Sequence, residues 1–245
     1  MLEDTVFATA RKKDIRLEPF PHLVIEEALD WAHYKRLLRT RPAYPGDPTP
    51  SNLRLPISGW MLMSLEHYDA VWRDFTRAHT DPEITYCVAE LFADHWPQHL
   101  PHLVPGATRF GVLGRDDFDE VDVLTDARLE IISPVHGSPG SHRRGHVDTS
   151  NRLFSALFYL RAAEDDSTAS GLELFRYKGA PPDRLDAFEL PPEAIECIKT
   201  IPYQANTLVV FPNSPFAVHG SEVRKDTPHE RAYVFITAEV EQDLF

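Results

Sequence analysis

Residues 146–161 read HVDTSNRLFSALFYLR, and the interpretation of the whole chain starts from this stretch. From Arg152 onward it is a run of aliphatic and aromatic side chains, which predicts a buried β-strand. His146 and Asp148 stand just before that strand. In extended backbone, residues i and i+2 point to the same side, so these two side chains can converge on one ion.

The spacing of His146 and Asp148 is a weak signal by itself. The chain has 12 histidines, and His-x-Asp occurs three times where roughly one occurrence is expected by chance. The motif at 67–69 falls in a stretch that predicts a helix over about 65–78, where residues two apart do not share a face. The motif at 79–81 precedes a proline and predicts the end of one helix and the N-cap of the next. Of the three motifs, only the one at 146–148 is therefore placed to bind one ion.

Two further strands are predicted downstream. Residues 207–211 read TLVVF and are followed by His219, and residues 231–239 read RAYVFITAE. In the last strand one face carries Arg231, Tyr233, Phe235 and Thr237. Two imidazoles and one carboxylate leave half of the coordination sphere of an octahedral iron open, as non-heme Fe(II) oxygenases require. Arg231 is a candidate anchor for an acidic co-substrate, because a guanidinium donates two parallel hydrogen bonds to a carboxylate.

The order of these motifs resembles the Fe(II)/2-oxoglutarate-dependent dioxygenases of the prolyl-hydroxylase-like branch. The resemblance covers roughly residues 128–240, and the entry PFPHLVIEEAL at 19–29 is also similar to bacterial members. The motifs that carry it are HVD at 146–148, FYLR at 158–161, GLELF at 171–175, NTLVVFP at 206–212, HG at 219–220 and Arg231.

The resemblance implies a cofactor set and a role for four residues. Fe(II) would be bound by His146, Asp148 and His219, and Arg231 would pair with the distal carboxylate of 2-oxoglutarate. O₂ would be the second co-substrate, with ascorbate as a candidate reductant. Many family members also carry a tyrosine on the strand before His-x-Asp. Here residues 128–135 read RLEIISPV, so the second contact to 2-oxoglutarate stays open.

The implied reaction is hydroxylation of an unactivated C–H bond in a small molecule, an amino acid or a peptide. Related halogenases lack the carboxylate ligand, so Asp148 favours hydroxylation, desaturation or a related oxidation over halogenation. The alternative is a non-catalytic jelly-roll protein that binds a metal or another ligand. The presence of all three ligand types together with Arg231 favours the enzyme, because an inactive relative need not keep them.

The expected fold is mainly β with flanking helices: a double-stranded β-helix, jelly-roll or cupin-like, packed by N-terminal helices. We expect a single oxygenase domain over 1–245, with an N-terminal strand and helices in 1–106 and the jelly-roll core in 107–240. The helices are predicted near 28–39, 65–78 and 83–96, and a loop rich in Pro, Gly, Asp and Ser over 43–56.

Composition narrows the partners and the compartment. Hydrophobic content is 42%, and no run approaches the 18 or so apolar residues of a membrane span. The N-terminus shows no secretory pattern, and two distant cysteines, Cys87 and Cys197, favour a reducing, cytoplasmic compartment. A net charge of −13 argues against nucleic acid and leaves a small-molecule or peptide substrate, cationic and zwitterionic ones included. The oligomeric state stays open.

Three other groups of residues compete for roles. Arg224 is the main rival to Arg231, but it lies in the charged segment EVRKD at 222–226 and is expected to be solvated. The segment HRR at 142–144 is expected to be a solvated loop, with a lid that touches an anionic group of the substrate as the alternative. Large aromatic side chains of the predicted strands are expected in the core rather than against a substrate: Phe154, Phe158 and Phe211.

Overall fold

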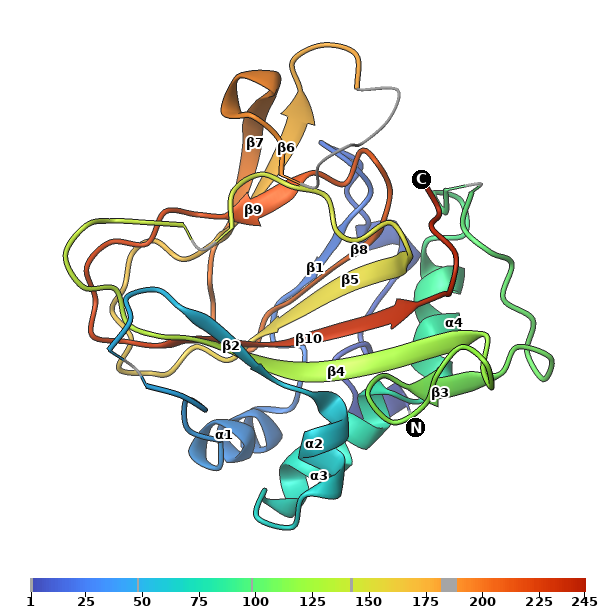
Figure 1. Ribbon diagram of the computed structural model, residues 1–245, viewed down its shortest axis with the longest axis horizontal. Helices are drawn as coiled ribbons and strands as arrows, with labels where there is room; N and C mark the ends of the chain where they lie inside the picture. The colour runs from blue at the N-terminus through green and yellow to red at the C-terminus, as the bar shows by residue number, and fades with distance from the viewer. Residues whose placement is uncertain (1, 48, 98, 142, 182–188) are drawn as a thin grey trace.

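A computed structural model describes residues 2–47, 49–97, 99–141, 143–181 and 189–245. Its strands are, in chain order, β1 (Leu23–Ile25), β2 (Arg54–Ile57), β3 (Phe110–Val112), β4 (Val123–Ile132), β5 (Arg152–Tyr159), β6 (Leu172–Tyr177), β7 (Ile195–Ile201), β8 (Leu208–Pro212), β9 (His219–Ser221) and β10 (Arg231–Glu239). They form a large sheet of order β1-β8-β5-β10-β4-β2, with β3 parallel to β4, and a small sheet of order β7-β6-β9 (Figure 1). Every other strand pair is antiparallel, as expected for a jelly roll.

The helices precede most of the strands. They are α1 (Trp31–Arg39), α2 (Gly59–Ser64), α3 (Ala70–His79) and α4 (Pro82–Leu91), with short 3₁₀ turns η1 (Leu2–Asp4), η2 (Lys12–Asp14) and η3 (Pro192–Ala194). Each α-helix begins after a side chain that accepts hydrogen bonds from the first turn: Asp30, Ser58, Asp69 and Asp81. The predicted end of one helix and N-cap of the next at 79–81 is therefore confirmed.

Three predicted helix boundaries differ from those of the structure. The helix predicted from residue 28 begins at Trp31, because Asp30 caps it. The helix predicted over 65–78 begins at Ala70, because Asp69 caps α3, and α2, which ends at Ser64 before the predicted range, was not predicted. The helix predicted to reach residue 96 ends at Leu91.

The predicted loop over 43–56 ends in an unexpected strand. Residues 54–57 form β2, which pairs antiparallel with β4, Arg54 opposite Ile132 and Ile57 opposite Leu129. This strand is the edge of the large sheet, where Pro56 is tolerated because one side of the strand needs no hydrogen-bond partner. The edge strand brings Arg54 to the same end of the sheet as Arg231, which also lies opposite Ile132.

The large sheet has two different faces. Val234 and Ile236 of β10 belong to the core shared with the helices, of which α1, α2 and α3 lie below the large sheet in Figure 1. Tyr233 and Phe235 of the same strand pack with Leu174 and other residues of the small sheet. The predicted face of the last strand and the mainly-β jelly-roll fold are thus confirmed. None of the described helices has the length and apolar character needed to cross a bilayer.

Candidate metal centre and co-substrate pocket

The two histidines that stand far apart in sequence are paired through their backbones. The amide of His146 donates to the carbonyl of His219 over 2.8 Å, and the amide of His219 donates back over 2.9 Å. The two rings therefore lie together, with centroids 4.3 Å apart. Gly220 permits this approach, because a Cβ there would lie 2.9 Å from the backbone of Arg144.

Asp148 completes a compact cluster of possible metal ligands. Its Oδ1 is 3.7 Å from Nε2 of His146, and its Oδ2 is 3.6 Å from Nε2 of His219. The candidate ligand atoms of all three residues lie within 4.8 Å of one another, and each residue is at most 4% exposed. A small buried group of two imidazoles and one carboxylate has the composition and reach of a facial iron site.

The surroundings of the histidines set which nitrogen is available. Nδ1 of His146 lies 2.7 Å from the carbonyl of Arg144, and Nδ1 of His219 lies 2.9 Å from the carbonyl of Ala217. A carbonyl can only accept, so each Nδ1 carries the proton and each Nε2 keeps its lone pair toward Asp148. Burial, with a further contribution from His146, lowers the pKa of His219 to about 3, which keeps that ring neutral.

The carboxylate of Asp148 is held from two sides. Ser155 donates its hydroxyl to Oδ2 over 2.5 Å, and Nη1 of Arg152 lies 3.0 Å from Oδ1. Burial by itself would raise the pKa of Asp148, but the neighbouring Arg152 and the histidines outweigh it and hold that pKa well below its usual range. Asp148 is therefore an ionised carboxylate with a fixed orientation, as a metal ligand would require.

Arg231 is 2% exposed and lies inside the protein. Its Nε donates to the carbonyl of Ser170 over 2.7 Å, and its Nη1 has no hydrogen-bond partner among the described residues. Three tyrosine rings surround its guanidinium at 4.8–5.4 Å, those of Tyr159, Tyr203 and Tyr233. An unpaired, buried guanidinium nitrogen is costly, and an anionic ligand would remove that cost.

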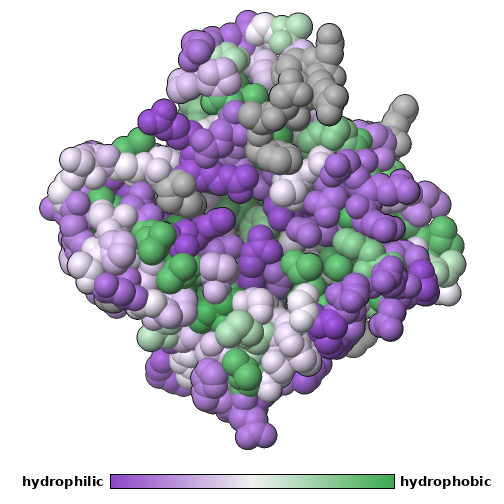
Figure 2. Space-filling view, in the orientation of Figure 1, coloured by the Kyte–Doolittle hydropathy of each residue, from purple (hydrophilic) through white to green (hydrophobic). Residues whose placement is uncertain are grey.

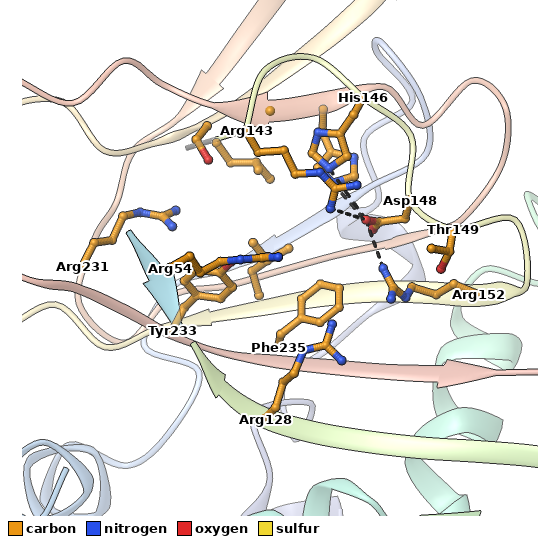
Figure 3. A pocket seen from close by; sticks show the side chains of 15 residues that line it. Arg54, Arg128, Arg143, His146, Asp148, Thr149, Arg152, Arg231, Tyr233 and Phe235 are labelled. Atoms are coloured by element: carbon orange, nitrogen blue, oxygen red, sulfur yellow. Dashed lines mark ion pairs between the residues drawn. The ribbon is translucent and has the colours of Figure 1, made fainter. Parts of the chain in front are cut away.

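The triad and Arg231 line one cavity of about 230 Å³ between the two sheets. Figure 2 shows the face of Figure 1 hollowed near its centre, where hydrophilic residues predominate. Figure 3 shows Arg231 on the side of the pocket away from Asp148. Five arginines of the described part of the chain line the cavity: Arg54, Arg128, Arg143, Arg152 and Arg231.

The interpretation of Arg224 as a solvated residue is wrong. Arg224 is 1% exposed, and its guanidinium donates to the carbonyls of Ser133 and His229 and to the side chain of Asn52. It does not line the cavity, so its role is to hold three chain segments together.

The 142–144 segment is also more than a solvated loop. Arg144 is exposed, but Arg143 lines the pocket and lies 3.6 Å from Asp148; His142 is outside the described residues. The prediction of a core position is confirmed for the three aromatic residues Phe154, Phe158 and Phe211.

Arg54, Arg128 and Arg152 were missed by sequence reasoning, although one signal for Arg128 exists. Residues 126–131 read DARLEI, in which charged side chains alternate with apolar ones inside a strand. Arg128 lies between Asp126 and Glu130 on one face of β4, with ion pairs of 2.9 and 2.8 Å. Charged residues at every second position of a buried strand indicate a polar cavity wall.

No protein-family model and no curated protein matches the chain. Among solved structures it is similar to a prolyl-4-hydroxylase from Pseudomonas putida, with 14% identity, 99% of this chain and 100% of that chain covered, and a TM-score of 0.47. It is also similar to a 2OG-Fe(II) oxygenase family oxidoreductase from Burkholderia pseudomallei, with 12% identity, 91% of this chain and 86% of that chain covered, and a TM-score of 0.46. The epimerase SnoN, solved with Fe³⁺ and alpha ketoglutarate, gives 12% identity, 89% and 78% coverage, and a TM-score of 0.47. At 12–14% identity, the chemistry of this chain follows from its own residues and not from these structures.

Proposed function

We propose that this protein is an Fe(II)- and 2-oxoglutarate-dependent oxygenase that hydroxylates a C–H bond of a small molecule, an amino acid or a peptide. The observation that carries the proposal is the pairing, in one cavity, of a buried His-Asp-His cluster with a buried arginine whose Nη1 lacks a partner among the described residues. The first feature suits Fe(II), and the second suits the distal carboxylate of 2-oxoglutarate.

The residues present fit both groups. Nε2 of His146 and of His219 and one oxygen of Asp148 would hold the metal. Near Arg231, the buried hydroxyl of Tyr159 is another polar group without a partner in the described part of the chain, and a carboxylate is acceptor-only. Tyr159 is thus our candidate for the second co-substrate contact that the 128–135 strand does not supply.

The protein's own part is to hold and orient the reactants. Bound Fe(II) would supply O₂ activation coupled to oxidative decarboxylation of 2-oxoglutarate. Ser155 and Arg152 keep the carboxylate of Asp148 in place. Apolar side chains on the cavity wall limit water around the reacting C–H bond: Leu157, Leu172 and Phe235.

The first experiment adds Fe(II) and 2-oxoglutarate to the protein without oxygen. We expect a weak visible charge-transfer band, which Asp148→Ala abolishes and His67→Ala leaves unchanged. His67 is the matched control because it belongs to another His-x-Asp motif, outside the cavity. Absence of the band in folded wild-type protein would instead support the non-catalytic ligand-binding alternative.

A second experiment identifies the reaction. Candidate substrates are screened for succinate release that depends on 2-oxoglutarate, and the products are identified by mass spectrometry. Hydroxylation adds one oxygen atom, desaturation removes two hydrogen atoms, and epimerisation leaves the mass unchanged. If succinate release is accompanied only by desaturated or epimerised products, the hydroxylase assignment is overturned and the oxygenase class is kept.

A further inference from the structure

We propose that the substrate carries an anionic group, a carboxylate or a phosphate, and that Arg54 and Arg143 bind it at the mouth of the pocket. This substrate class rests on the proposed oxygenase function and makes it more specific.

The pocket is strongly cationic in an acidic protein. The chain has a net charge of −13, yet five arginines line this one cavity. Asp148 is the single carboxylate among the described residues of the wall, and the proposed function assigns it to the metal. A cavity with such an excess of fixed positive groups attracts anions, because its low-dielectric walls focus the field.

Three of the five arginines have other partners. Arg128 is paired with two buried carboxylates behind the wall, at 2.9 and 2.8 Å. Arg152 is paired with Glu239 at 2.7 Å and with Asp148 at 3.0 Å. Arg231 is assigned to 2-oxoglutarate.

The remaining two arginines have weaker ion pairs. Nη1 of Arg143 lies 3.6 Å from Asp148, and Nε of Arg54 lies 3.8 Å from Glu130. Both are cationic guanidinium groups on the wall of one cavity, and an anion bound between them would be attracted by both.

The positions of Arg54 and Arg143 suit a ligand that enters from solvent. Their side chains are 37% and 28% exposed, whereas that of Arg152 is 8% exposed. They come from different elements, the edge strand β2 and the segment before the His-x-Asp motif, and both extend into the cavity (Figure 3). Planar guanidinium groups from two sides can bind one carboxylate or phosphate with several charge-assisted hydrogen bonds.

The test measures binding of simple anions by calorimetry to protein loaded with Mn(II) and saturating 2-oxoglutarate. The probes are inorganic phosphate and the matched pair benzoate and benzamide, which differ in charge and hardly in shape. We expect phosphate or benzoate to bind, and benzoate to bind at least tenfold more tightly than benzamide. Failure of both anions to bind, or equal binding of benzoate and benzamide, would overturn the proposal.

Variants then locate the anion. Arg54→Gln and Arg143→Gln should each weaken anion binding by at least about tenfold, or about 1.4 kcal/mol, and leave 2-oxoglutarate affinity within about twofold. Arg143→Lys should recover part of the loss, which separates charge from packing. Arg109→Gln is the control, because Arg109 is an exposed arginine with one carboxylate partner, Asp122 at 2.7 Å, outside the cavity.

Three outcomes separate this proposal from the proposed function. If metal and 2-oxoglutarate bind but the two variants bind anions normally, only the substrate assignment fails. If both variants lose 2-oxoglutarate affinity as much as anion affinity, these arginines serve the co-substrate and the proposal is overturned. Absence of metal binding to wild-type protein refutes the oxygenase, and the same anion titration on metal-free protein still decides whether Arg54 and Arg143 bind anions.

Discussion

Replacing Arg231 by leucine should weaken 2-oxoglutarate binding without a comparable loss of stability. Nε of Arg231 is already used by the carbonyl of Ser170, so Nη1, which has no partner among the described residues, is left for the distal carboxylate. Loss of this charge-assisted contact in a site that is 2% exposed should cost about 2–4 kcal/mol, or about 30- to 900-fold in affinity. Calorimetric titration of 2-oxoglutarate into Mn(II)-loaded wild-type and variant protein measures the difference.

Arg224→Leu is the matched control, and it should show the opposite pattern. The guanidinium of Arg224 donates to two backbone carbonyls and to Asn52, and its loss leaves buried acceptors without a donor. A cost of about 3 kcal/mol would lower the melting temperature by about 6–12 °C for a chain of this length, with 2-oxoglutarate affinity unchanged in the folded protein. A folded Arg224 variant that loses 2-oxoglutarate, beside an Arg231 variant that binds it normally, would refute the reasoning.

The remaining predictions concern the metal ligands and the buried histidine of α3. Asp148→Ala should lower Fe(II) affinity by about a hundredfold or more in anaerobic titrations and leave far-UV circular dichroism unchanged; wild-type turnover without added carboxylate or halide would contradict the triad. Ser155→Ala should lower Fe(II) affinity by about tenfold, because Ser155 orients the carboxylate of Asp148, and an unchanged affinity would remove this role. His79→Ala should leave Fe(II) affinity intact, as His67→Ala should, and iron loss in either folded variant would point to another His-x-Asp motif. Burial lowers the pKa of His79 to about 4, so the unfolded chain binds more protons between pH 4 and about 6.5. His79 therefore adds stability that is complete above pH 6.5 and is lost, by up to about 3 kcal/mol, as the pH falls through 4. His79→Gln should make the midpoint of denaturant unfolding less dependent on pH over this range.

Local sequence patterns were sufficient to predict the structure where it depends on a single strand or a single turn. The expected strand over 231–239 has these bounds in the structure, since period-two alternation and β-branched residues act within a single segment. The N-cap after His79 was predicted for the same reason. The start of α3 was placed about five residues too early, and α2 was missed, although the Asp69 and Ser58 caps are equally local.

The sequence by itself determined the class of fold and which side chains can serve as metal ligands. His146 and Asp148 are neighbours along the chain, so extended backbone is enough to bring them together. Their approach to His219 depends on a backbone pairing that no local pattern contains.

Only the tertiary structure decided the charge of the cavity. Arg224 and Arg54 both lie in polar segments. Arg224 is nevertheless buried and donates to backbone carbonyls, whereas Arg54 reaches the pocket because it belongs to the edge strand of the large sheet. Burial and the sign of a cavity's charge are set by contacts between distant segments. Such contacts depend on the combined interactions of many residues that lie far apart in the sequence. Strand periodicity, in contrast, follows from a few neighbouring residues.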